Sequence, residues 1–185
     1  MRALPIAVTV LAAALALTSC DGGGSGSAGT SGKSGDTAGS AKKAAVAACV
    51  IGDTGIQVGP ANAATAAGDT GNIPVTLTNK SAQCTLKGFP GLSVEGGGTS
   101  AAVAADKSAA PEQLTLAKGD TASFTITYVR GAEGDAKSLA VKTLKIALPG
   151  ADTAQSFPWS YGPVTGKGSA SSPNASTTPF QHAGD

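Results

Sequence analysis

The sequence predicts an all-β protein, an antiparallel immunoglobulin-like β-sandwich of about 7-8 strands. Apolar and polar residues alternate with a period of two in several short runs, which is typical of strands that bury one face. Turn signals rich in Gly, Pro and Asp separate these runs. No convincing amphipathic helix competes with them. A barrel made from a single sheet is the structural alternative.

The first 19 residues have the organisation of an export signal. Arg2 precedes an apolar run of 15 residues, from Ala3 to Leu17. At about 1.5 Å per residue, this run is too short to cross a hydrocarbon core of roughly 30 Å. We therefore interpret residues 1–19 as a signal peptide that is removed from the mature protein.

The signal ends in Leu17-Thr18-Ser19-Cys20, which resembles a bacterial lipobox. The resemblance implies that Cys20 carries diacylglycerol and fatty acyl chains such as palmitate, and that cleavage makes it the mature N-terminus. The predicted location is then the outer face of the cytoplasmic membrane, within the cell envelope. The alternative is an ordinary secretory signal in which Cys20 is incidental.

Residues 20–47 are predicted to be the lipidated cysteine and a flexible linker. Segment 21–45 is rich in Gly and Ser and has no apolar period, so it buries too little surface to offset the entropy of ordering. Its r.m.s. reach is roughly 25–30 Å for a Gly/Ser chain of this length. The run Gly24 to Gly29 matches the dinucleotide-binding pattern, but the strand and helix which that site requires are not predicted around it.

The three cysteines divide between the lipid and one disulfide. Once the lipid occupies Cys20, Cys49 and Cys84 remain as a pair. Because disulfides persist outside the cytoplasm, we predict a bridge between them, which the chain-entropy model values at roughly 3.5–4 kcal/mol. Two buried free thiols are the alternative. Metal ligation is less favoured, because the single histidine, His182, lies near the C-terminus.

Residues 48–165 hold the alternating runs and form the predicted sandwich domain. The apolar members of these runs are Ile73, Val75 and Leu77; Leu92 and Val94; Leu114 and Leu116; Ala122, Phe124, Ile126 and Tyr128; and Leu144, Ile146 and Leu148. Between them, Phe89-Pro90-Gly91-Leu92 predicts a type II turn with positive φ at Gly91. Gly96-Gly97-Gly98 and Ala117-Lys118-Gly119-Asp120 predict similar turns.

Several motifs of this domain occur in a specific order. A strand ending in Asn79-Lys80-Ser81 is followed by Cys84-Thr85-Leu86-Lys87-Gly88-Phe89-Pro90-Gly91, with Cys49 before it and Leu116-Ala117-Lys118-Gly119 after it. This order resembles an actinobacterial family of secreted and lipoprotein domains of unknown function, number 4232, over about residues 48–162. The resemblance implies a sandwich with a Cys49–Cys84 bridge and no particular activity. Many members carry a second cysteine pair, which this chain lacks.

Residues 166–185 are rich in Ser, Thr, Pro and Ala and carry no period, so we predict a disordered tail. Asn79-Lys80-Ser81 and Asn174-Ala175-Ser176 match the acceptor pattern for N-glycosylation. We discount both in a bacterial lipoprotein, while O-mannosylation of threonines in the tail is left open.

Composition disfavours catalysis and nucleic-acid binding. Loss of Arg2 with the signal reduces the 13 basic residues to 12, equal to the 12 acidic ones, so the mature chain has no basic patch for nucleic acid. His182 is too close to the C-terminus for a catalytic triad. Copper carriage would need His and Met ligands, and the only methionine, Met1, is lost with the signal. Nearly all of the acidic residues lie in predicted turns, where carboxylates are solvated. We expect no enzyme activity, no cofactor and no metal.

Phe157, Trp159 and Tyr161 recur with a period of two and are the candidate binding face. In a strand, the three rings point to one side. If that side is exposed, they form a platform for sugar rings or for a partner protein. The alternative is that the rings pack into the core or against the end of the sandwich, with Pro158 and Pro163 favouring an edge position.

Three functions follow from these observations. The leading prediction is a non-catalytic binding or adaptor domain, held at the membrane by Cys20, monomeric, and engaging an unknown envelope protein or glycan. The first alternative is a carbohydrate-binding module for wall polysaccharide, which requires the Phe157, Trp159 and Tyr161 face to be exposed. The second is a hydrolase with an unrecognised carboxylate site.

Overall fold

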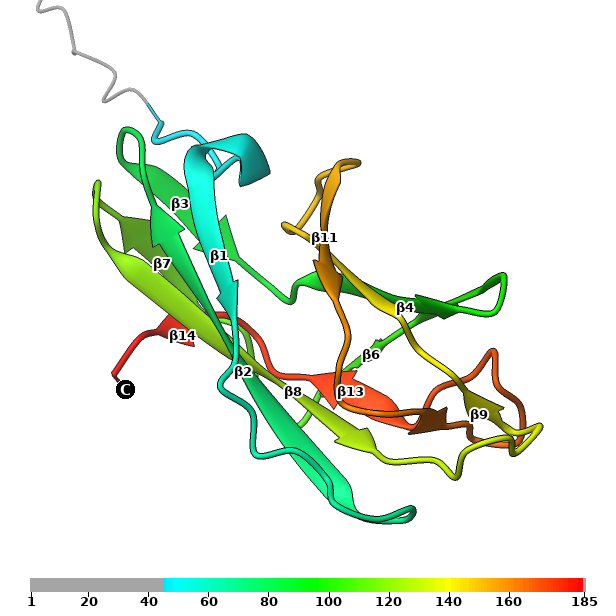
Figure 1. The fold of residues 1–185 in the computed structure, drawn as a ribbon. Coiled ribbons are helices and arrows are strands. Elements are labelled where there is room, and N and C mark those ends of the chain that lie inside the picture. The colour runs from blue at the N-terminus through cyan, green and yellow to red at the C-terminus, as the bar shows by residue number, and fades with distance from the viewer. Residues whose placement is uncertain (1–44, 185) are drawn as a thin grey trace, which may run out of the picture. The chain divides into compact units, whose positions relative to one another are not determined.

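The computed structural model describes residues 45–184 (Figure 1). Within these residues, the chain forms fourteen strand segments and one short 3-10 helix, η1 (Ile51–Asp53), so the predicted all-β class is confirmed. No helix in this part of the chain is long and apolar enough to cross a membrane. The predicted signal peptide, Cys20 and most of the predicted linker lie outside the described residues.

Two main sheets build the predicted β-sandwich (Figure 1). The long sheet has the order β1-β2-β8-β13-β6, and β14 also pairs with β8. Its strands are β1 (Thr54–Val58), β2 (Thr70–Asn79), β8 (Thr121–Val129), β13 (Ala175–Thr177), β6 (Ala104–Ala105) and β14 (Gln181–His182). All of these pairs are antiparallel except that of β13 with β6, which is parallel.

The short sheet has the order β11-β10-β4-β5 and is antiparallel. Its strands are β11 (Ala154–Pro158), β10 (Thr143–Ala147), β4 (Gly91–Gly96) and β5 (Thr99–Ala102). Two further pairs complete the fold: β3 (Cys84–Lys87) with β7 (Gln113–Leu116), and β9 (Ser138–Leu139) with β12 (Val164–Thr165). The structure has more segments than the predicted 7-8 strands, in part because β6, β9, β12 and β14 have only two residues, which are too few to show alternation.

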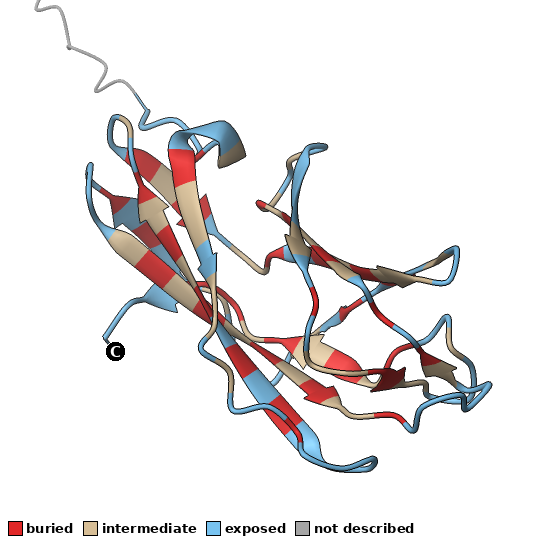
Figure 2. Cartoon of the chain, viewed as in Figure 1, coloured by how far each residue is buried: buried red, intermediate tan, exposed pale blue. Residues whose placement is uncertain are grey.

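The core lies between the sheets and is built by the predicted alternation. Buried residues alternate with half-buried or exposed ones along β2 and β8, as the colours of Figure 2 show. Val75 of β2 and Phe124 of β8 are paired in register and almost fully buried, and Ile146 of β10 joins the same core from the short sheet. Burial of each such side chain stabilises the fold by about 1.5–3 kcal/mol.

Two of the three predicted turns have the expected conformation. Gly97 and Gly98, with φ of 56° and 78°, close the hairpin between β4 and β5, and Gly119 has a φ of 94° before β8. The predicted turn with positive φ at Gly91 is wrong. Gly91 pairs with Ala147 as the first residue of β4 and is therefore extended, and the positive φ of 117° occurs instead at Gly88.

The prediction that residues 166–185 form a disordered tail is wrong for the described residues, which extend to residue 184. β13 pairs with β8 in the long sheet, and the side chain of Phe180 is only 1% exposed. The ring of Phe180 packs edge-on against Phe124, with centroids 5.1 Å apart, and its amide donates to the carbonyl of Gly88 at 3.0 Å. The ordered structure thus continues past the predicted domain end at residue 165.

Replacing Phe180 with Ala should lower the free energy of unfolding by about 3–5 kcal/mol, because the change leaves a cavity beside Phe124. Urea denaturation followed by tryptophan fluorescence measures this loss. His182→Ala, in the exposed strand β14, is the matched control and should change stability by less than about 0.5 kcal/mol. Equal and small effects of the two substitutions would contradict a packed tail.

Candidate functional site

The start of the domain is fixed to β3 by a covalent bond and two hydrogen bonds. The predicted bridge between Cys49 and Cys84 is confirmed, with the two Cα atoms 4.9 Å apart. The amide of Cys49 donates to the carbonyl of Thr85 at 2.9 Å, and the amide of Thr85 donates to the carbonyl of Ala47 at 2.8 Å. Both cysteines belong to the buried core. The chain therefore enters the domain through a rigid junction.

The side chain of Asn79 joins two connections that are distant in the sequence. It is 1% exposed, and its Nδ2 donates to the carbonyls of Ala82 at 2.9 Å and Leu116 at 3.0 Å. Its Oδ1 accepts from the amide of Ser81 at 3.1 Å. These bonds give the Asn79-Lys80-Ser81 motif a structural role, which the sequence analysis missed. A buried amide of this kind is also not accessible for glycosylation.

The aromatic segment after β11 packs inward. Trp159 is 6% exposed, and its indole meets the rings of Tyr128 and Tyr161 edge-on at 5.2 and 5.0 Å. Its Nε1 donates to the carbonyl of Gly162 at 2.7 Å. Phe157 and Tyr161 are half-buried against the core, and burial together with the nearby Tyr128 phenol raises the pKa of Tyr161. The structure thus shows the packed alternative, and these three rings do not form an exposed platform.

Several carboxylates stabilise turns, as their predicted position in turns indicates. Asp69 accepts hydrogen bonds from the amide of Ala66 at 2.9 Å and the hydroxyl of Thr65 at 3.0 Å, and these bonds lower the pKa of Asp69. Similar bonds, from backbone amides first, lower the pKa of Asp106 and Asp135. A general acid for glycoside hydrolysis requires the opposite shift.

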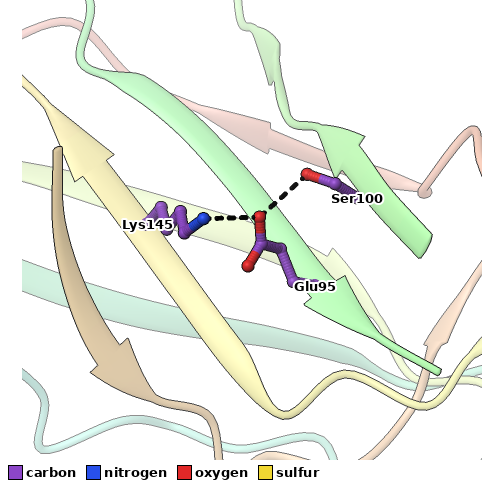
Figure 3. Close-up of polar contacts among 3 residues, drawn as sticks. All are labelled: Glu95, Ser100 and Lys145. Atoms are coloured by element: carbon purple, nitrogen blue, oxygen red, sulfur yellow. Dashed lines mark hydrogen bonds and ion pairs between the residues drawn. The ribbon is translucent and has the colours of Figure 1, made fainter. Parts of the chain in front are cut away.

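Glu95 and Lys145 form an ion pair on the outer face of the short sheet (Figure 3). Lys145 Nζ lies 2.8 Å from Glu95 Oε1, and the hydroxyl of Ser100 donates to the same oxygen at 3.1 Å. The Lys145 hydrogen bond, with that from Ser100, holds the pKa of Glu95 below its usual value. Among the described residues, no group of three His, Cys, Asp or Glu side chains is placed to hold a metal ion.

The outer face of the long sheet is covered by uncharged polar side chains. Within β2 and β8, the non-buried positions opposite the core carry Thr, Ser or Asn, except for Pro74 and Val129. We call this surface the hydroxyl face and define it by Asn72, Thr76, Thr78, Thr121, Ser123, Thr125 and Thr127. The strand registers extend it with Gln57 of β1 beside Thr76, and with Gln181 of β14 beside Ser123. One row across four strands is therefore amide, hydroxyl, hydroxyl, amide.

A groove of about 370 Å³ borders the hydroxyl face at the edge strand β1. Gln57 and Thr78 line it from the long sheet, and Gln155 lines it from β11 of the short sheet. Lys80 also lines the groove, and its side chain lies over Gly55, where the missing Cβ leaves room for it. Thr78 belongs to both the groove and the hydroxyl face, so the two surfaces adjoin at the end of β2.

A family model described as Domain of unknown function (DUF4232) matches residues 49–181. The match spans the disulfide and continues through Phe180 into β14, so it contains both ends of the sandwich. No curated protein and no solved structure matches the chain.

Replacing both Cys49 and Cys84 with Ala should lower the free energy of unfolding by about 3–4 kcal/mol, because the unfolded chain gains the freedom of a loop with a sequence separation of 35. Urea denaturation with and without a reductant measures the effect. Reductant should lower the stability of the wild type toward that of the variant and leave the variant unchanged. A variant as stable as the oxidised wild type would refute the expected stabilisation.

The turn carboxylates should make the domain less stable in acid. Because the pKa values of Asp69, Asp106 and Asp135 are lowered by folding, their stabilisation is complete above the unfolded value of about 3.9 and is lost as the pH falls through the folded values. The triple substitution D69N/D106N/D135N should flatten this decline, measured as Tm against pH. An identical decline in both proteins would mean that other groups cause it.

Proposed function

The chain belongs to the family described as Domain of unknown function (DUF4232), and from this premise we propose that it is an exported, membrane-anchored lipoprotein with a non-catalytic binding domain. Its partner is a protein or glycan of the cell envelope, on the outer side of the cytoplasmic membrane. The observation that carries the proposal is the covalent junction between Cys49 and Cys84, at the point where the segment following Cys20 enters the domain.

The junction supports export because structural disulfides form and persist in oxidising compartments. Two features of the N-terminal sequence then indicate the same location, outside the cytoplasm. Residues 1–19 have the length and composition of a signal peptide, and Cys20 follows a lipobox-like sequence. Secretion and lipidation also agree with the resemblance of the domain to an actinobacterial family of secreted proteins and lipoproteins.

The junction also supports a tethered domain as the working part of the protein. A force or thermal displacement carried by the linker reaches the domain at Cys49, where a covalent bond and the hydrogen bonds to Thr85 oppose it. A displacement of the anchor is therefore opposed at the bridge before it reaches the core strands. Such a domain functions by presenting a fixed surface to its surroundings.

Binding is favoured over catalysis by the way in which the polar side chains are used. Asp69, Asp106 and Asp135 are committed to turns, and Glu95 is committed to Lys145. The hydroxyl face, in contrast, is a broad outward surface made by the regular sheet. We propose that the domain acts as a monomer through a surface of this kind, without a cofactor.

The Cys20→Ala variant, produced in the native host, should leave the membrane fraction and appear in the soluble fraction. The wild type should stay with the membrane and give a peptide beginning at Cys20 with the mass of diacylglycerol and an acyl chain added. The C49A/C84A variant is the control, because it removes the other cysteines and should retain the lipid. An unmodified Cys20 in the wild-type protein, or a wild-type protein found only in the medium, would contradict the proposal.

A further inference from the structure

We infer that the hydroxyl face binds a neutral, polyhydroxylated polysaccharide of the cell envelope. The inference rests on the proposed function, because it assigns the chemical class of ligand to the envelope binding domain. It does not involve the aromatic segment, since Trp159 is buried. The surface in question is the outward side of β2 and β8, extended by Gln57 and Gln181.

The hydrogen-bonding groups of the hydroxyl face are available to a ligand. Thr127 donates to Asn72 at 2.9 Å, whereas the hydroxyls of Thr76 and Ser123 make no hydrogen bond to another side chain or carbonyl in the described part of the chain. Each hydroxyl and each amide can both donate and accept. A sugar hydroxyl can also donate and accept, so each polar group of the hydroxyl face can form a hydrogen bond with a hydroxyl of a glycan.

The sheet holds these groups in a fixed and repeating arrangement. β2 and β8 are paired over nine residues, from Thr70 opposite Val129 to Thr78 opposite Thr121. Equivalent groups therefore lie about 4.7–4.9 Å apart across the strands and roughly 6.5 Å apart along them. Threonine is stiff at χ1, so little side-chain entropy is lost on binding. Pro74, opposite Thr125, is the one break in the polar positions of β2 between Asn72 and Thr78. An otherwise repeating array of this kind suits a ligand that is itself a repeating polymer.

The charge distribution favours a neutral ligand. The outward positions of β2 and β8 carry no charged residue. Charged residues adjoin both ends of the pair, with Lys80 and Asp120 beyond the Thr78–Thr121 end and Asp69 and Arg130 beyond the Thr70–Val129 end. An anionic polymer or a nucleic acid is instead recognised by several basic side chains. The short sheet provides the contrast, because its outer face carries the Glu95–Lys145 ion pair (Figure 3).

A protein partner fits this face less well. Protein interfaces concentrate their binding energy in Trp, Tyr, Arg and Met, none of which occurs among the outward residues of β2 and β8. Val46 and Val50 are the exposed large hydrophobic residues in the described part of the chain, and both precede β1 and belong to neither β2 nor β8. Contacts with single sugars through hydrogen bonds are weak, but a polymer supplies many sites and gains from multivalency.

The test uses the chain from Cys20 onward, purified in detergent from its native host, together with a T76V/T125V variant. Valine keeps the shape and strand preference of threonine and replaces the hydroxyl with a methyl group. Retention is measured on immobilised neutral glucan, mannan, galactan and arabinan, on the neutral polysaccharide fraction of the host envelope, and on an anionic uronic-acid polymer. The matched control is Thr143→Val, which removes a hydroxyl from the outer face of the short sheet.

We expect the wild type to be retained on at least one neutral polymer, and high salt should not abolish this retention. T76V/T125V should bind that polymer roughly tenfold more weakly, as expected for two lost hydrogen bonds. T143V should bind it as the wild type does. Equal losses in both variants, retention only on the anionic polymer, or no retention on any polymer would overturn the inference. Photo-crosslinking from position 76 to a protein instead of glycan would also overturn it. None of these results depends on the lipid, so a failure here leaves the mass measurement on Cys20 as the separate test of the proposed function.

Discussion

The pairing of β2 with β8 is the constraint on which the rest of the structure depends. Its register places Ile73, Val75 and Phe124 on the core side with at most 1% exposure, and places the hydroxyl face on the other side. Because side chains alternate with a period of two, a slip of one residue would exchange the two sets and bring the hydroxyls into the core. The core and the candidate binding surface are therefore two results of one register.

The longer strands could be predicted because burial of one face of a strand produces a regular alternation of apolar and polar residues. The alternation from Ala122 to Tyr128 is that of β8 in the structure. Asn79 and Phe180 could not be predicted in this way, because their roles depend on groups far away in the chain. Asn79 is held by carbonyls near residue 116, and Phe180 by the ring of Phe124. A single residue that contacts a distant part of the chain produces no repeating pattern in the sequence.

The candidate site was only partly visible in the sequence. The period-two aromatic residues were recognised, but periodicity does not say which side of an edge segment is covered, and Trp159 is directed inward. The threonines of β2 and β8 appeared as the polar half of each strand, which is ordinary for an exposed sheet. Only the registers that place Gln57, Thr76 and Ser123 in one row reveal a continuous surface.

The position of β13 beside β8 has a consequence for folding during synthesis of the protein. The long sheet is completed by residues 175–177, and Phe180 closes the core after them. Residues up to Phe180 must therefore be present before the long sheet and the core can be completed, and pairings between such distant segments form slowly. Because a chain is synthesised from its N-terminus, this delays completion of the fold until residues 175–180 have been made. The same strand that completes the sheet thus makes the native fold dependent on one of the last segments to be synthesised.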